Sequence, residues 1–328
     1  MGGNALKEGL TERKTATAYH ALAETVRRNA ALFCSRAEII PSYEEKLSFG
    51  DLDIVVSSDL ETEPFKAQIT EKFQPSEIVK NGPCWSFDHA RFQIDLIEAE
   101  PEDFEATFFY FSYNDLNNLV GRTARGVGLK FGHLGLIAPV VVGSETKEIA
   151  LTKKPEEIYG FLGYDHGRFK RGFKNLEEIF EFVTSSELFD PSDFGEGNHK
   201  SRTRNAKRKT YNVFLEWLES RGKTTKAENP TKRNLVEIGL THFGKREVLE
   251  GLKTEEDRRE QIRRKFNGER VSRLTGLKTL ELGGFLAEFK HLWKTRQALD
   301  EWLLATPQEE IDRKIKNEAV MRRTTDMS

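Results

Sequence analysis

The chain has 328 residues, enough for two or three domains with sizeable cores. Its 51 basic and 53 acidic residues give a formal net charge of -2, so a nucleic-acid partner would have to be bound by a local basic patch. The two cysteines, Cys34 and Cys84, form no CxxC pair, which argues against a disulfide framework or a structural zinc and favours a reducing, cytoplasmic location. The longest apolar run, at 134–143, is too short for a membrane span, so no membrane partner is expected.

Helical and strand patterns alternate in the first half of the chain. A helix is expected at 15–31, where Ala18, Leu22, Val26 and Ala30 recur at helical spacing. The elements expected after it are a strand at 37–40, a strand from residue 51, a helix at 63–73, strands at 85–87 and 91–98, an aromatic strand at 107–112, a helix at 114–125, and a hairpin of 134–142 with 148–152. This order predicts a mixed sheet with helices around it.

Beyond Pro155 the strand signals end. Helices are expected at 155–162, 176–189, 203–221, 235–252, 254–266, 282–304 and 307–320. We therefore predict an α+β fold with an N-terminal helix (1–35), a mixed-sheet domain (36–154) and an all-helical domain (155–328), with the boundary at 152–156.

Three aspartates stand at strand positions. Side chains alternate along a strand, so Asp51 and Asp53 should point to the same face. Asp95 lies inside a second apolar strand, where an unpaired carboxylate is costly to bury. Such carboxylates suit hard cations, here two Mg²⁺ (or Mn²⁺) ions, which support phosphoryl and nucleotidyl transfer. The alternative is a pair of strand-end aspartates plus a solvent-facing one.

A series of motifs resembles a known family. Residues 50–56 (GDLDIVV) and 92–97 (FQIDLI) resemble the palm of the DNA polymerase beta superfamily of nucleotidyltransferases, with the family X polymerases as the closer match. The resemblance continues through 102–106, 110–115, Asn118, Arg122, 128–133 and 155–159, and covers roughly 37–165. It implies a catalytic palm at 36–154 in which Asp51, Asp53 and Asp95 hold the metals and an NTP or dNTP is the substrate.

The resemblance also implies a nucleotide site beside the helix at 114–125. Tyr110 and Phe111 would pack under the incoming sugar, and Asn118 and Arg122 would contact its base and the template. Spacings of i, i+4 and i+7 place Asn118, Arg122 and Arg125 on one helix face. The alternatives are an aromatic core cluster and a solvated helix face.

The loop before residue 51 departs from the family. Family members carry a glycine–serine pair and two arginines there, which bind the triphosphate. Here Ser42 matches the serine, Pro41 replaces the glycine, and Glu44 and Glu45 stand where basic residues are expected. Two acids would repel a triphosphate unless they turn away. The remaining candidates for nucleotide binding in this loop are Lys46 and Ser48.

A basic segment precedes an aromatic helix in the second half. Residues 198–209 hold six Lys or Arg and no acid, a pattern that favours contact with phosphates, although a solvated loop is the alternative. We therefore predict that the helical domain (155–328) binds nucleic acid. The residues predicted to bind nucleic acid are Arg125, Lys130, Lys200, Arg202, Arg204, Lys207, Arg208 and Lys209. A second basic run, at 258–265, is interleaved with acids and predicts ion pairs within a helix.

The tail carries a second, shorter resemblance. Residues 266–286 are similar to a helical segment of bacterial-type CCA-adding enzymes and poly(A) polymerases, and a packing helix–turn–helix is the alternative. We therefore expect a two-metal nucleotidyltransferase that extends the 3′-hydroxyl of a nucleic acid, DNA or RNA. Transfer to a protein or a small molecule, RNA or tRNA 3′-end addition, and a non-catalytic nucleic-acid-binding palm remain alternatives.

Overall fold

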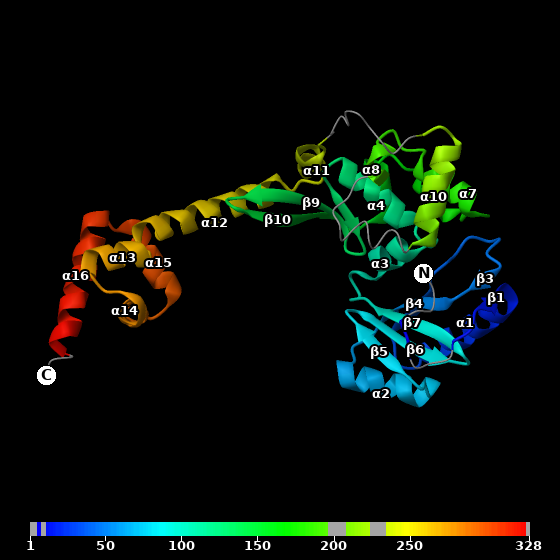
Figure 1. Ribbon diagram of the computed structural model, residues 1–328, viewed down its shortest axis with the longest axis horizontal. Coiled ribbons are helices and arrows are strands. Elements are labelled where there is room, and N and C mark those ends of the chain that lie inside the picture. The colour runs from blue at the N-terminus through cyan, green and yellow to red at the C-terminus, as the bar shows by residue number, and fades with distance from the viewer. Residues whose placement is uncertain (1–4, 8–10, 196–207, 224–233, 326–328) are drawn as a thin grey trace. The chain divides into compact units, whose positions relative to one another are not determined.

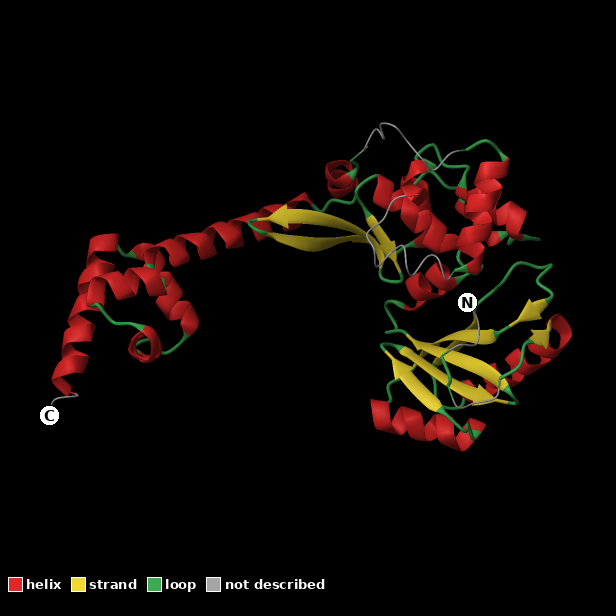
Figure 2. Ribbon diagram, viewed as in Figure 1, coloured by secondary structure: helices red, strands yellow, loops and turns green. Residues whose placement is uncertain are grey.

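The computed structural model describes residues 5–7, 11–195, 208–223 and 234–325 (Figures 1 and 2). The chain forms two compact units. Unit 1 comprises Met1–Val140 and Glu148–Lys245, and unit 2 comprises Val141–Lys147 and Arg246–Ser328. The expected boundary at 152–156 does not coincide with this division.

A five-stranded sheet forms the first part of unit 1. Its strand order is β2-β4-β7-β6-β5, and β4 and β7 run parallel while the other neighbours are antiparallel. The elements of this part are β1 (Lys14–Thr15), α1 (Ala16–Ala30), β2 (Arg36–Ile39), β3 (Ser48–Phe49), β4 (Asp51–Ser57), α2 (Thr62–Phe73), β5 (Ile78–Asn81), β6 (Cys84–His89) and β7 (Phe92–Glu98). Strand β5 is absent from the sequence prediction.

Alternation along β4 gives the sheet two different faces. Leu52, Ile54 and Val56 pack with α1 and α2 in one buried cluster, because residues two apart share a face. Val55, on the opposite face, packs with Phe104, the first residue of the helix that follows β7. Asp51 and Asp53 share that second face.

Helices and a three-stranded sheet complete unit 1. They are α3 (Phe104–Phe111), α4 (Leu116–Gly126), β8 (Lys130–Gly132), β9 (Gly135–Val142), β10 (Glu145–Thr152), α5 (Pro155–Phe161), α6 (His166–Lys170), α7 (Leu176–Val183), α8 (Ser192–Gly195), α10 (Lys209–Ser220) and α11 (Val236–His242). The tip of the β9–β10 hairpin, residues 141–147, belongs to unit 2. The predicted strand at 107–112 is wrong, since residues 107–111 belong to α3 and Ser112 is its C-cap.

Buried polar contacts hold these helices together. Asn117 of α4 donates to the Phe109 carbonyl at 2.6 Å and accepts from the Tyr159 hydroxyl at 2.6 Å. Asn117 and Tyr159 are fully buried, so each of these bonds satisfies a group that water cannot reach. Helices α3, α4 and α5 are thus fixed in one arrangement beside the sheet.

Unit 2 is helical apart from the hairpin tip. Its helices are α12 (Arg246–Lys265), α13 (Gly268–Thr275), α14 (Thr279–His291), α15 (Arg296–Ala305) and α16 (Gln308–Thr325). Two predicted boundaries are wrong: the chain breaks at 243–245 rather than 253, and the helix expected at 282–304 is divided by residues 292–295. Thr295 explains the second break because its side chain accepts from the Ala298 amide as the N-cap of α15.

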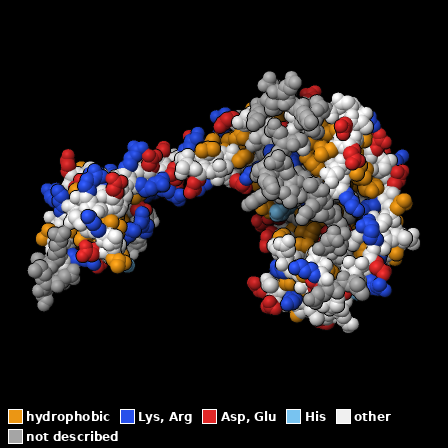
Figure 3. All heavy atoms as spheres, viewed as in Figure 1, with side chains coloured by type: hydrophobic (Ala, Val, Ile, Leu, Met, Phe, Trp, Pro, Cys, Tyr) orange, Lys and Arg blue, Asp and Glu red, His pale blue; other side chains and the backbone are white. Residues whose placement is uncertain are grey.

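The ion pairs predicted within 255–265 are confirmed. Arg259 pairs with Glu255 at 3.1 Å, and Arg264 pairs with Glu260. Figure 3 shows basic and acidic side chains intermixed along α12. In the described residues past Thr152 every element is a helix, so the predicted α+β class, with a mixed sheet followed by a helical region, is confirmed. The described part of the chain has no helix both long and apolar enough to cross a membrane.

Candidate metal and nucleotide site

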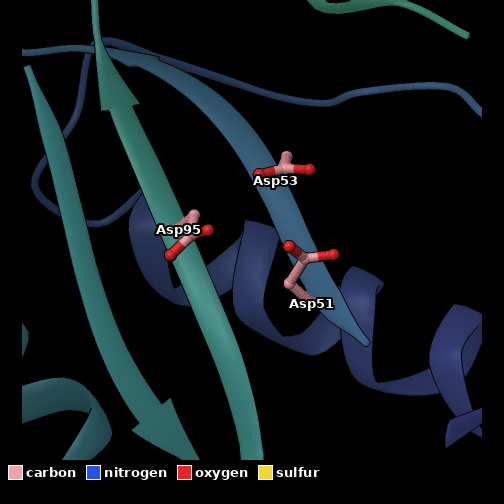
Figure 4. Close-up of side chains that lie close together, drawn as sticks. All are labelled: Asp51, Asp53 and Asp95. Carbon is pink, nitrogen blue, oxygen red and sulfur yellow. The ribbon is translucent and has the colours of Figure 1, made fainter. Parts of the chain in front are cut away.

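Three carboxylates meet on the second face of the sheet (Figure 4). Asp51 and Asp53 come from β4, and the parallel register places Asp53 opposite Asp95 of β7. One ligand oxygen from each aspartate lies within 4.8 Å of the others. The sequence prediction that these residues come together is therefore confirmed.

The carboxylates are costly to ionise together. The pKa of Asp53 is raised well above its ordinary value, first by burial and then by the negative charges of Asp51 and Asp95. Burial, assisted by Asp51, raises the pKa of Asp95 to about 6, although hydrogen bonds from Ser86 and Gln93 oppose the rise. A bound cation would remove this repulsion.

Gln93 and Ser86 orient Asp95. The Gln93 amide nitrogen donates to both oxygens of Asp95 at 3.0 Å, and Ser86 lies opposite Asp95 in the antiparallel register. Supporting hydrogen bonds of this kind fix the geometry of a metal ligand. An all-oxygen set of three carboxylates could hold a hard divalent cation such as Mg²⁺ or Mn²⁺.

Lys46 is the predicted loop residue that lies within electrostatic reach of the carboxylates. Burial lowers its pKa, while the negative charges of Asp51 and Asp53 act in the opposite direction. Its ammonium lies 4.4 Å from the centre of the Phe49 ring. Lys46 therefore places a positive charge beside the cluster.

Two further residues near the cluster were not predicted. Tyr19 of α1 stacks on Phe49 at 3.7 Å, and burial raises the pKa of its hydroxyl, with Asp53 and Asp51 adding to the rise. The positive charge of Arg13 helps to lower the pKa of Lys46. The Arg13 Nε donates to the Ser48 hydroxyl at 2.9 Å. Neither carried a sequence signal, because both approach from a segment more than 30 residues away from β4.

Glu44 and Glu45 of the loop form hydrogen bonds with residues 173–175. The amides of Glu44 and Glu45 donate to the carbonyls of Phe173 and Lys174 at 2.9 and 2.8 Å. The carboxylate of Glu45 accepts from Asn175 at 3.2 Å, and both glutamates are exposed. Ser42 is half-buried in the same loop. The loop is thus fastened to the start of α7.

The predicted nucleotide-binding aromatics lie on α3. Tyr110 is half-buried, with its ring centre 5.3 Å from that of Phe111 and 5.4 Å from that of Phe131. Phe111 packs against the cluster around Val55, on the face of the sheet that carries the aspartates. Both rings therefore take part in an aromatic cluster, the alternative considered from the sequence.

Residues of α4 are unequally buried. Arg122 is only 7% exposed, and its guanidinium lies 5.5 Å from the centre of the Tyr211 ring. Asn118 has a buried side-chain oxygen with no hydrogen-bond partner among the described residues. Arg125 is exposed, so a uniformly solvated face does not describe this helix.

Two left-handed residues connect α3 to α4. Tyr113 has φ 59° and Asn114 has φ 63°, a conformation costly for residues other than glycine. The Tyr113 amide donates to the Pro41 carbonyl at 2.8 Å. This bond joins the connection between α3 and α4 to the loop that carries Ser42 and Lys46.

Four residues of the predicted basic segment, Lys200, Arg202, Arg204 and Lys207, lie outside the described residues. Arg208 is ion-paired at 2.7 Å with Asp115, the residue before α4, and Lys209 is exposed. The aromatic face expected behind them is present, because Tyr211 and Phe214 are buried. Lys130 is exposed and paired with Glu148.

Replacing Arg208 with methionine should destabilise the protein. Both side chains of the Arg208–Asp115 pair are about four-fifths buried, so the change leaves a partly buried carboxylate unpaired. We expect a loss of about 2 kcal/mol in urea unfolding, and Asp115→Asn should recover part of it in a double-mutant cycle. Arg171→Met, which breaks the exposed pair with Asp165, is the control and should change little. Additive effects would show that the two side chains do not interact.

No protein-family model and no curated protein matches this sequence. The functional assignment therefore rests on the residues themselves.

Proposed function

We propose that this protein is a metal-dependent nucleotidyltransferase that adds a nucleotide from an NTP or dNTP to the 3′-hydroxyl of a nucleic acid and releases pyrophosphate. The observation that carries the proposal is the convergence of Asp51, Asp53 and Asp95 from two parallel strands. The motif resemblance around these residues supports it. Bound Mg²⁺ or Mn²⁺ would neutralise phosphate charge and align the attacking and leaving oxygens.

The side chains of the site have separate tasks. Asp51 and Asp53 would hold both cations, and Asp95 would hold the one nearest the attacking hydroxyl. Gln93 keeps both oxygens of Asp95 fixed. Either the Asp95 carboxylate or a water molecule would accept the proton of the 3′-hydroxyl. Lys46 would bind the triphosphate, with Arg13 as a second cation at the same side.

Asn118 and Arg122 would contact the incoming base. The unpartnered oxygen of Asn118 is an acceptor that a base amino group would satisfy. Tyr110 and Phe111 would support the sugar from the adjacent helix. These assignments make α3 and α4 one wall of the nucleotide site and β4 with β7 the other.

The proposal is tested by primer extension and pyrophosphate release with pure protein. The reactions use Mg²⁺ or Mn²⁺, separate NTP and dNTP pools, and labelled DNA and RNA primers with and without template. Extension that is lost in Asp53→Ala supports the proposal, and the preferred pool and primer distinguish DNA from RNA synthesis. Failure to extend any primer would overturn it and favour another acceptor or a non-catalytic palm.

Lys46→Met should raise the KM for the nucleoside triphosphate about tenfold and lower kcat less. The variant loses the ammonium beside the carboxylates but keeps most of the apolar stem against Phe49. Lys46→Arg should restore much of the affinity. Lys66→Met, an exposed change on α2 across the sheet, is the matched control and should leave KM unaltered. An unchanged KM in Lys46→Met would remove Lys46 from the triphosphate site.

A further inference from the structure

Unit 2 carries two open grooves that share one tryptophan. The first, about 540 Å³ in volume, is lined by Trp293, Trp302, Arg313 and Lys314 among others. The second, about 590 Å³, is also lined by Trp293, together with Lys290 and Lys294 among others. We call the walls of both grooves, with these six residues, the Trp293 surface.

The aromatic part of this surface is accessible from outside. Trp293 and Trp302 are half-buried at the edge of the helical core, with ring centres 4.9 Å apart and planes at 40°. The Lys314 ammonium lies 5.6 Å from the Trp293 ring centre. Indole rings that reach a groove between basic residues offer flat faces for stacking.

The charge of the second groove is strongly one-sided. Its described lining includes Lys290, His291, Lys294 and Arg296 and no acidic residue. Arg296 is paired with Asp300 at 2.9 Å, but Lys290 and Lys294 have no carboxylate partner among the described residues and are exposed. The first groove is more balanced, since Glu310 and Glu318 line it and Glu318 pairs with Lys314. Unbalanced positive charge is thus concentrated in the second groove.

We propose that the Trp293 surface binds single-stranded nucleic acid. A base stacks on Trp293 while neighbouring phosphates contact Lys290 and Lys294. A duplex would hide the base faces that the indole needs, and an acidic polypeptide would leave the indole unused, so an unpaired strand fits both features. The role of this surface in holding the acceptor strand rests on the proposed transferase function. The binding of a single strand to the surface does not depend on that function.

The test measures binding by the full-length protein in EDTA, by fluorescence anisotropy of labelled oligothymidylate and oligouridylate. Lys290→Glu with Lys294→Glu should weaken binding at least about tenfold and reduce its salt dependence. The matched control, Lys253→Glu with Lys316→Glu, makes the same charge change at exposed positions outside both grooves and should have a much smaller effect. Equal weakening by both pairs would show that overall charge alone attracts the strand and would overturn the proposal.

Tryptophan replacements test stacking. Trp293→Ala should weaken binding about tenfold, whereas Trp293→Phe keeps an aromatic ring and should bind within about threefold of the natural protein. Strand binding should quench tryptophan emission in the natural protein and quench it far less in Trp293→Phe. Equal affinity for a duplex without quenching, or displacement of the strand by polyglutamate as readily as by unlabelled oligonucleotide, would overturn the proposal. The binding assay contains EDTA and therefore does not depend on nucleotide transfer. A protein that binds the strand but extends no primer would reject the transferase and leave the binding site standing.

Discussion

Replacing Asp51 with asparagine is expected to slow nucleotide transfer by more than about a thousandfold. The amide removes one negative charge from a cluster whose three ligand oxygens lie within 4.8 Å of one another. A neutral ligand would hold a divalent cation weakly, and the charge that develops on the phosphates would lose most of its stabilisation. Single-turnover incorporation at saturating nucleotide measures the effect directly.

Asp59→Asn provides the matched control for this experiment. It makes the same chemical change at an exposed aspartate just beyond the end of β4. Activity should remain near that of the natural protein, and the unfolding of both variants without metal should stay cooperative. Rapid transfer by Asp51→Asn would show that the three aspartates are not the reaction centre. That result would not bear on strand binding by unit 2.

Asp95→Asn should make the metal-free protein more stable at neutral pH. The folded-state pKa of Asp95 is about 6, above the ordinary value of 3.8, mainly because the carboxyl is buried. Between these values the folded state binds more protons than the unfolded state, so stability falls as pH rises and the loss is complete above the folded pKa. The loss at neutral pH is of the order of 2–3 kcal/mol, and asparagine, which has no charge to bury, avoids it.

Urea unfolding in EDTA at about pH 4 and about pH 7 measures this difference. The natural protein should lose stability between the two conditions more steeply than Asp95→Asn, while Asp59→Asn should follow the natural protein. Adding Mg²⁺ or Mn²⁺ should reverse the order at neutral pH, because the cation stabilises the intact carboxylate cluster and much less the variant. If metal stabilises the natural protein and Asp95→Asn equally, Asp95 is not a ligand.

The face on which the aspartates lie was predictable from local sequence. Alternation along β4 fixed Asp51 and Asp53 to one side and Leu52 and Ile54 to the other, since the strand period of two leaves no second solution. The same argument reaches Gln93, which stands two residues before Asp95 and therefore shares its face. That contact could have been predicted from the sequence.

Other features depended on information that local patterns lack. Residues 104–111 are mostly apolar or aromatic, so they show neither the helical period of 3.6 nor the strand period of two. The sequence therefore predicts a strand where a helix forms. The approach of Tyr19 to the carboxylates and of Arg13 to Ser48 depends on where the N-terminal segment packs in the fold. The pairing of Arg208 with Asp115 likewise joins residues far apart in the sequence. Such contacts follow from tertiary packing rather than from spacing along the chain.

The hairpin tip has a practical consequence for dividing the protein into fragments. Because residues 141–147 belong with the C-terminal helices, the polypeptide passes between the two units three times rather than once. A fragment ending at Lys245 would retain a tip deprived of its own helices, and one beginning at Arg246 would lack a piece of its surface. A faithful dissection would replace 141–147 with a short turn in the first fragment and supply that peptide separately to the second.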